Sequence, residues 1–242
     1  MIALAITFLA SAMRAESKEA SLLHITHSAG YRHEVLELSQ QILREIGARS
    51  GAFTVTTTED LAVFTPEKLA PYAAILFFTS GELPLNAAQK RAFLDFVRTG
   101  HGFVGFHSAT DTLYQWRGYL ELIGGYFNDH PWHQKVRVTV ADPANPLVAF
   151  LGKGFEIDDE IYQISDFDWR HAQVLLRLDP SSVDVTGDRV HPRFYGWPLA
   201  WTRNYGLGRV FYTALGHEPA VWRDRRYQQL IENGIRWAIK AR

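Results

Sequence analysis

Histidines follow three separate apolar segments of this 242-residue chain. Each segment has the composition of a buried strand, and each histidine comes shortly after its end. The residues concerned are His27 and His33 after 22–26, His107 after 102–106, and His217 after 209–213. In an open parallel sheet the carboxyl ends of the strands share one edge, where ligands bind. The sequence therefore predicts a cluster of histidines at this edge.

Two further segments supply side chains of similar chemistry. His130 and His133 lie in one polar loop, and Glu160 and Tyr162 lie in an acidic segment that begins at Asp158. Neutral imidazoles and carboxylates together are ligands of zinc, manganese or ferrous iron. The same groups perform general acid–base catalysis near neutral pH, so both roles are open. The expected metal ligands are His33, His107, His130 and His217.

The segments that position these side chains alternate between strands and helices. In the first half, strands are expected at 22–26, 53–58, 73–78 and 102–106, with helices at 31–46, 65–69, 86–98 and from about Asp111. This order is typical of a parallel sheet covered by helices on both faces. In the second half, strands are expected at 136–140, 158–164 and 173–177, a hairpin at 199–203 and 209–213, and a helix at 225–239. Gly47 is expected to end the first helix. The sequence shows no repeat or linker, and we predict one α/β domain over residues 21–242.

The composition excludes several classes of function. Lys and Arg number 25 against 26 Asp and Glu, so the net charge is −1 and no basic footprint for nucleic acid exists. Cysteine is absent, which excludes disulfides, thiolate metal sites and cysteine nucleophiles. The chemistry must therefore rely on histidines, carboxylates, hydroxyls or a metal held by nitrogen and oxygen.

The first 15 residues are similar to an export signal. Residues 1–10 are apolar and Ala10-Ser-Ala12 offers a small-residue cleavage site, although the positively charged start of a signal peptide is missing. The run is shorter than the roughly 20 residues that span a bilayer, and no other segment predicts a membrane span. We expect a signal peptide or truncated leader and export to the periplasm. A cytoplasmic chain that starts with a buried strand is the alternative.

Five segments in order resemble one family. Gly105-Phe-His107-Ser-Ala109 follows an apolar strand with the spacing of a nucleophile elbow. The matching segments are 27–33, 102–110, 124–130, 160–162 and 208–217. They cover the chain from about residue 22 to its end and resemble the ThuA-like (trehalose utilisation) family of the class I glutamine amidotransferase-like superfamily.

The resemblance implies a fold and a substrate class. The fold would be a flavodoxin-like or class I glutamine amidotransferase-like three-layer sandwich with a mostly parallel central sheet. The amidotransferases place a cysteine at the elbow, where this chain has His107, so glutaminase activity is excluded. ThuA-like proteins are associated with disaccharide catabolism through 3-keto sugars, and some hold a metal in this pocket. The resemblance implies a carbohydrate substrate. We expect no nucleotide cofactor.

The leading hypothesis is an enzyme that acts on 3-keto-glycosides by elimination or hydrolysis. A base would remove the proton beside the carbonyl, the glycosidic oxygen would leave, and water would add to the resulting enone. The expected catalytic residues are His107, Glu160, His217, Tyr162 and Asp111. The expected substrate-binding residues are His27, Tyr31, Ser108, Trp132 and Trp201.

Two other hypotheses compete with this one. Ser108 could be a nucleophile with His217 as its base, or the chain could be an exported sugar-binding domain without catalytic activity. Trp222 and the aromatic-rich loops could supply an interface with a second copy of the chain. His24, inside the first strand, is expected to be a core side chain with its hydrogen bonds satisfied.

Overall fold

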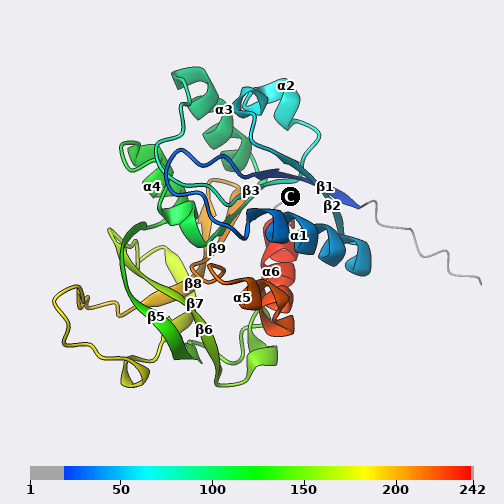
Figure 1. Ribbon diagram of the computed structural model, residues 1–242. Coiled ribbons are helices and arrows are strands. Elements are labelled where there is room, and N and C mark those ends of the chain that lie inside the picture. The colour runs from blue at the N-terminus through cyan, green and yellow to red at the C-terminus, as the bar shows by residue number, and fades with distance from the viewer. Residues whose placement is uncertain (1–18, 241–242) are drawn as a thin grey trace, which may run out of the picture.

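One nine-stranded sheet organises the chain in a computed structural model that describes residues 19–240 (Figure 1). Its strands are β1 (Ala20–Ile25), β2 (Phe53–Thr58), β3 (Ala74–Phe77), β4 (Gly102–Phe106), β5 (Tyr126–Val140), β6 (Gly154–Ser165), β7 (Ala172–Leu178), β8 (Pro198–Tyr205) and β9 (Gly208–Thr213). Their order across the sheet is β2-β1-β3-β4-β9-β8-β7-β5-β6. The expected leader, residues 1–15, lies outside the described residues.

The sheet changes from parallel to antiparallel at β9. Strands β2, β1, β3, β4 and β9 pair in parallel, and every pairing from β9 to β6 is antiparallel. The expectation of a mostly parallel sheet therefore holds for one half only. The reason is connectivity: β8 and β9 form the expected hairpin, turning at Gly206 with a φ of 60°, and a hairpin joins antiparallel strands.

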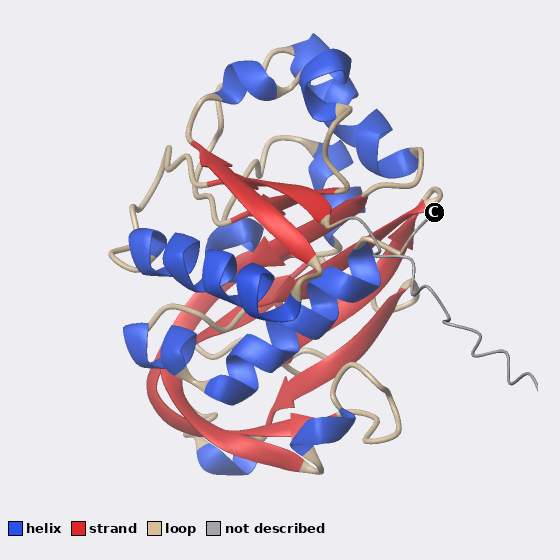
Figure 2. Ribbon diagram, turned by 90° about the vertical axis from the view of Figure 1, so that its right-hand side faces the viewer, coloured by secondary structure: helices blue, strands red, loops and turns tan. Residues whose placement is uncertain are grey.

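Within residues 19–240, six α-helices accompany the sheet. They are α1 (Leu36–Ser50), α2 (Pro66–Leu69), α3 (Ala87–Arg98), α4 (Arg117–Ile123), α5 (Pro219–Arg223) and α6 (Arg225–Ala238). Figures 1 and 2 show α1 and α6 side by side. Among the helices of residues 19–240, none combines the length and apolar character needed to cross a membrane.

The helices cover both faces of the parallel half. All five residues of β4 are buried, and alternate side chains of a strand point to opposite faces. Phe103 packs against Phe93 of α3, with ring centroids 5.5 Å apart. Phe106, on the other face, packs against Trp222 of α5 at 5.6 Å. In this half, helices therefore lie on both faces of the sheet.

The first helix begins and ends later than predicted. Gly47 lies within α1, which continues to Ser50 and ends at Gly51 with a φ of 59°. Gly47 is needed for a close approach and not for termination, because a Cβ atom there would lie 2.3 Å from the Phe53 carbonyl oxygen. Before the start of α1, Tyr31 lies in a loop, and its backbone carbonyl accepts a hydrogen bond from the Ser80 hydroxyl. This loop carries His33 toward the sheet edge.

Candidate functional site

His107 occupies a backbone turn directly after β4. Its φ is 42°, in the left-handed region that residues other than glycine seldom adopt. The Tyr212 hydroxyl donates a hydrogen bond of 2.6 Å to the His107 carbonyl, and the Thr110 hydroxyl bonds to Tyr212 at 2.7 Å. The turn thus has the strained strand-to-helix geometry expected of an elbow.

The His107 ring is fixed by a backbone carbonyl. Its Nδ1 lies 2.7 Å from the Ala214 oxygen, which can only accept a hydrogen bond, so Nδ1 carries a proton. In neutral His107, Nε2 therefore has a free lone pair. That atom faces Nδ1 of His217 at 3.2 Å. A carbonyl that fixes the distal nitrogen of a histidine is the usual support of a metal-ligating imidazole.

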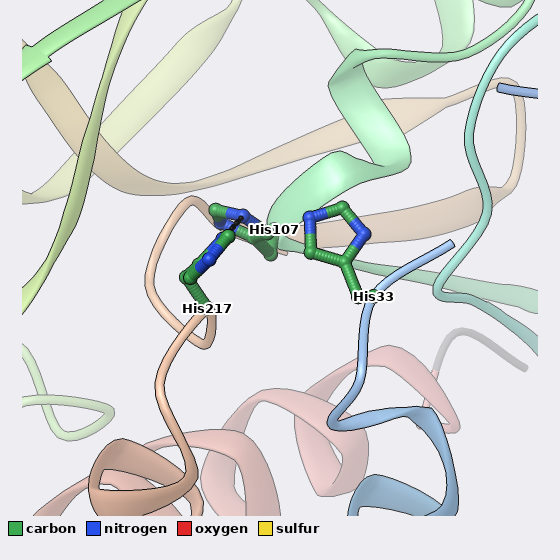
Figure 3. Close-up of side chains that lie close together, drawn as sticks. All are labelled: His33, His107 and His217. Atoms are coloured by element: carbon green, nitrogen blue, oxygen red, sulfur yellow. Dashed lines mark hydrogen bonds between the residues drawn. The ribbon is translucent and has the colours of Figure 1, made fainter. Parts of the chain in front are cut away.

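Three histidines meet at this point, as Figure 3 shows. His33 comes from the loop before α1, His107 from the turn after β4, and His217 from the loop after β9. One ring nitrogen of each lies within 4.8 Å of the others. Figure 3 draws these side chains from three chain segments converging on one place, as the strand-edge argument predicted.

Glu160 of β6 closes the cluster. Its Oε1 lies 3.4 Å from His217 Nδ1 and 3.6 Å from His107 Nε2, and its Oε2 lies 3.3 Å from His130 Nδ1. Burial raises the pKa of Glu160, but hydrogen bonds and charges from His107 and His217 outweigh burial and hold it well below its usual range. Glu160 is therefore ionised at neutral pH.

The histidines differ in their affinity for protons. Burial, with the neighbouring His107 and His217, lowers the pKa of His33 to about 3. Burial also lowers the pKa of His217, but the hydrogen bond and charge of Glu160 outweigh it and raise the pKa overall. The site thus holds an ionised base, Glu160, beside a histidine of raised pKa, His217.

Asp159 anchors the loop that carries His217. This fully buried carboxylate accepts hydrogen bonds from three consecutive backbone amides, those of Gly216, His217 and Glu218, at 2.8, 3.1 and 3.0 Å. The same loop supplies the Ala214 carbonyl that fixes His107. In the sequence, Asp159 is only one residue of an acidic run. Its role could not be predicted, because its hydrogen-bond partners lie in a loop that is distant in the sequence.

The cluster opens into a pocket of about 290 Å³. Its lining residues are Tyr31, His33, Asp111, Phe127, His130, Glu160, Tyr162 and His217. Tyr31 stands at the mouth and is 60% exposed. Tyr162 packs against the His107 ring with centroids 4.2 Å apart, and burial raises the pKa of Asp111. Phe127 was not foreseen, because a single aromatic residue carries no distinguishing signal in the sequence.

Four expected substrate-binding residues lie outside this pocket. His27 bonds through Nδ1 to the Glu59 carbonyl at 3.0 Å. Trp132 is buried and donates to the Asp184 carbonyl at 2.8 Å. Trp201 is fully buried within β8 and donates to the Ile123 carbonyl. Each of these tryptophans lies on a strand and is buried, so neither reaches the pocket. Trp222 is also fully buried, so it supplies no interface.

Ser108 is the fourth of these residues. It is fully buried, and its hydroxyl has no hydrogen-bond partner among the described residues. Its expected base, His217, instead faces His107 and Glu160. The hydrogen bond that a serine nucleophile requires is therefore missing.

A second group of candidate ligands shares His217. One atom each of His133, His217 and Glu218 lies within 4.8 Å of the others, and His133 Nε2 lies 2.8 Å from Glu218 Oε1. This group is more exposed than the first. The first group fits a divalent cation better, because two of its imidazoles are buried, one is fixed by a carbonyl, and the Glu160 carboxylate adjoins them.

Comparison with known families identifies the chain. A family model described as ThuA, trehalose utilisation, matches residues 21–238. The chain belongs to the ThuA family. This confirms the resemblance drawn from the sequence. A comparison with curated proteins gave no match.

Solved structures share the ThuA fold. A ThuA-like protein from Bacteroides uniformis is 24% identical, with a TM-score of 0.76 over 96% of this chain and 95% of that one. A ThuA-like protein from Parabacteroides merdae is 20% identical, with a TM-score of 0.73 over 92% of this chain and 90% of that one. A β-galactosidase from Bacillus circulans matches 90% of this chain with 31% of its own length, at 12% identity and a TM-score of 0.54. At these identities the likeness shows the fold alone.

Proposed function

We propose that this ThuA protein is an enzyme that cleaves 3-keto-glycosides, or related oxidised sugars, by acid–base elimination followed by hydration. The observation that carries this proposal is the pair Glu160 and His217. An ionised carboxylate and a histidine of raised pKa lie 3.4 Å apart in one pocket. Two groups whose environments separate their pKa values are suited to the roles of base and acid.

The pocket supports a substrate of limited size. Its volume of about 290 Å³ is at the lower end of the range for ligand sites, about 300–1,000 Å³. We take it to hold the oxidised ring, with the leaving group directed toward the exposed Tyr31. The aromatic rings of Tyr162 and Phe127, 4.3 Å apart, offer an apolar wall to that ring.

The reaction needs no oxidant or reductant. A ketone two carbons from the anomeric carbon acidifies the C–H between them. Glu160 removes that proton, the bond from the anomeric carbon to the glycosidic oxygen breaks, and His217 protonates the departing oxygen. Water then adds to the enone: its hydroxide joins the anomeric carbon, its proton goes to His217, and Glu160 returns the first proton to carbon. The products are an alcohol and a free keto sugar.

A metal ion fits the same site. His33, His107 and His217 would hold zinc, manganese or ferrous iron beside Glu160. When bound, the ion supplies Lewis acidity that favours negative charge on a neighbouring oxygen. Ligation by His217 and proton donation by His217 are alternatives, because both use the nitrogen that faces His107.

Hydrogen exchange tests the proposal and separates the two steps. The methyl glycoside of 3-ketoglucose, whose leaving group requires protonation, is incubated in D₂O with chelator-treated protein, alone or with zinc, manganese or ferrous ions. We expect deuterium to enter beside the ketone, and methanol to be released. Glu160→Gln should abolish exchange. His217→Gln should slow release about 10²-fold or more while exchange continues, because only the acid is lost. His27→Ala, outside the pocket, is the control.

Two outcomes would contradict the proposal. Binding of the keto sugar by the wild type without exchange or release, under all four conditions, would favour a non-catalytic sugar-binding protein. Exchange that persists in Glu160→Gln would remove Glu160 from the role of base.

A further inference from the structure

A second cavity lies on the antiparallel half of the molecule, beside β7. Its volume is about 450 Å³, and its walls include Trp169, Arg177, Phe194 and Tyr195. None of its lining residues belongs to the histidine pocket. It is therefore a separate feature whose interpretation does not depend on the proposed function.

Two aromatic rings beside this cavity are unusually exposed. Phe194 is 79% exposed and Trp169 is 49% exposed. Their rings meet edge to face with centroids 5.5 Å apart, and Phe194 also contacts Tyr195 at 5.0 Å. One exposed apolar side chain needs no explanation, but adjacent ones at the rim of a cavity indicate a binding surface.

The cavity also contains a guanidinium group without a carboxylate partner. The half-buried side chain of Arg177 donates to the Tyr195 carbonyl, and none of the ion pairs within residues 19–240 includes it. Asp168, the residue before Trp169 in the sequence, is already engaged by Arg203 and His171. Burial lowers the pKa of Arg177, as expected for a cation that has lost water without gaining an anion.

The rim of the cavity carries a second positive charge, that of Arg170. The Arg170 guanidinium lies over the Trp169 ring, 5.3 Å from its centroid. Arg177 keeps donors that make no hydrogen bond with the described residues, and a guanidinium fork matches a carboxylate in a two-point contact. The lining of the cavity thus combines a guanidinium group with aromatic side chains.

We propose that this cavity binds a small organic anion, a six-membered ring that carries a carboxylate. The carboxylate pairs with Arg177, and the ring packs against Phe194 and Trp169. A sugar acid and an aromatic acid share this chemistry. Glucuronate is the test compound for a sugar acid, and benzoate is the test compound for an aromatic acid. Glucose has a six-membered ring without a carboxylate and serves as the uncharged comparison.

Nuclear magnetic resonance of the ¹⁵N-labelled full chain tests the proposal. The indole N–H signal of Trp169, assigned with Trp169→Phe, reports on the cavity during titration with each of the three compounds. We expect a saturable shift with glucuronate, benzoate or both, and a much weaker response to glucose. A response to one acid alone identifies the source.

Variants locate the contact. Arg177→Gln should weaken binding about tenfold or more, the size of a lost charge-assisted hydrogen bond. Phe194→Ala should weaken it severalfold, and because that ring is exposed its removal leaves the fold intact. Arg117→Gln, an 81% exposed arginine of α4, is the control and should bind as the wild type does. Thermal melting of each variant checks folding.

Three results would overturn the proposal. They are the absence of any shift of Trp169 at millimolar concentrations of both acids, glucose binding as tightly as the acids, and unchanged affinity in Phe194→Ala. Unchanged affinity in Phe194→Ala would overturn the proposal even if Arg177→Gln does not fold.

Discussion

Nε2 of His107 lies 3.2 Å from Nδ1 of His217, and Glu160 Oε1 lies 3.4 Å from that same Nδ1. Since Nδ1 of His107 donates to the Ala214 carbonyl, the facing nitrogen of neutral His107 carries no proton. A hydrogen bond between the two rings therefore requires a proton on His217 Nδ1. The space between the rings suits one positive charge, either that proton or a metal cation.

Zinc binding should compete with this proton. We expect the zinc affinity of the wild type to fall as the pH falls through the raised pKa of His217, because the ion binds only the deprotonated ring. His33→Ala should lower the affinity at least about tenfold at any pH. Calorimetry in two buffers of different ionisation enthalpy measures the proton released. Zinc binding with no proton release near neutral pH, or equal affinity in His33→Ala and the His27→Ala control, would contradict this.

Asp159 should control the position of His217 without entering the pocket. Asp159→Asn replaces one accepting oxygen with a donating amide, which would face a backbone amide. We expect a loss of about 1.5–3 kcal/mol in the free energy of unfolding, together with weaker zinc binding. The exposed neighbour Asp158 supplies the matched control, Asp158→Asn. Denaturant unfolding and calorimetry measure both effects. If Asp159→Asn and Asp158→Asn have equal free energies of unfolding and equal zinc affinities, Asp159 does not hold the loop.

The turn at His107 should tolerate glycine better than alanine. Both substitutions remove the ring and should abolish zinc binding at the first histidine group. The φ of 42° favours glycine, however, because a left-handed conformation costs a residue with a Cβ atom about 1–2 kcal/mol. We expect His107→Gly to unfold at a higher denaturant concentration than His107→Ala. The reverse order would mean that the turn stores no backbone strain.

His24 should make the protein sensitive to acid. It was expected to be hydrogen-bonded, but it is fully buried and neither ring nitrogen has a partner among the described residues. Burial, with a smaller contribution from Arg44, lowers its pKa from 6.5 to about 3. Between these values the unfolded chain binds a proton that the folded chain does not, so stability falls as the pH falls from 6.5 toward 3.

The substitution His24→Leu isolates this effect. It should remove up to about 1.4 kcal/mol of pH dependence for each unit in that range, and it should raise stability at neutral pH because an unpaired buried polar group is lost. Denaturant unfolding at pH 4, 5 and 7 provides the comparison. A slope equal to that of the wild type would assign the acid sensitivity to other groups.

The sequence predicted the histidine cluster because the carboxyl ends of parallel strands meet at one edge of a sheet, whatever the order of the strands within it. The antiparallel half was harder, since apolar alternation shows that a strand exists but not which strand it pairs with. Trp201 illustrates this: its segment was predicted as a strand, but the sequence did not show that this part of β8 is buried on both faces and that Trp201 pairs with Tyr212. The role of Asp159 could not be predicted for a related reason, because its hydrogen-bond partners lie 57 to 59 positions away in the sequence.

The last strand along the chain, β9, lies inside the sheet between β4 and β8. During synthesis, β4 therefore emerges from the ribosome well before the strand that covers its free side. His107 and His217 are 110 positions apart, an interval of roughly 5–20 s at about 5–20 residues per second. Throughout that interval the nascent chain presents an apolar strand edge that can pair with another chain. Aggregation during expression should therefore respond to translation speed and chaperone supply more than to the stability of the finished fold.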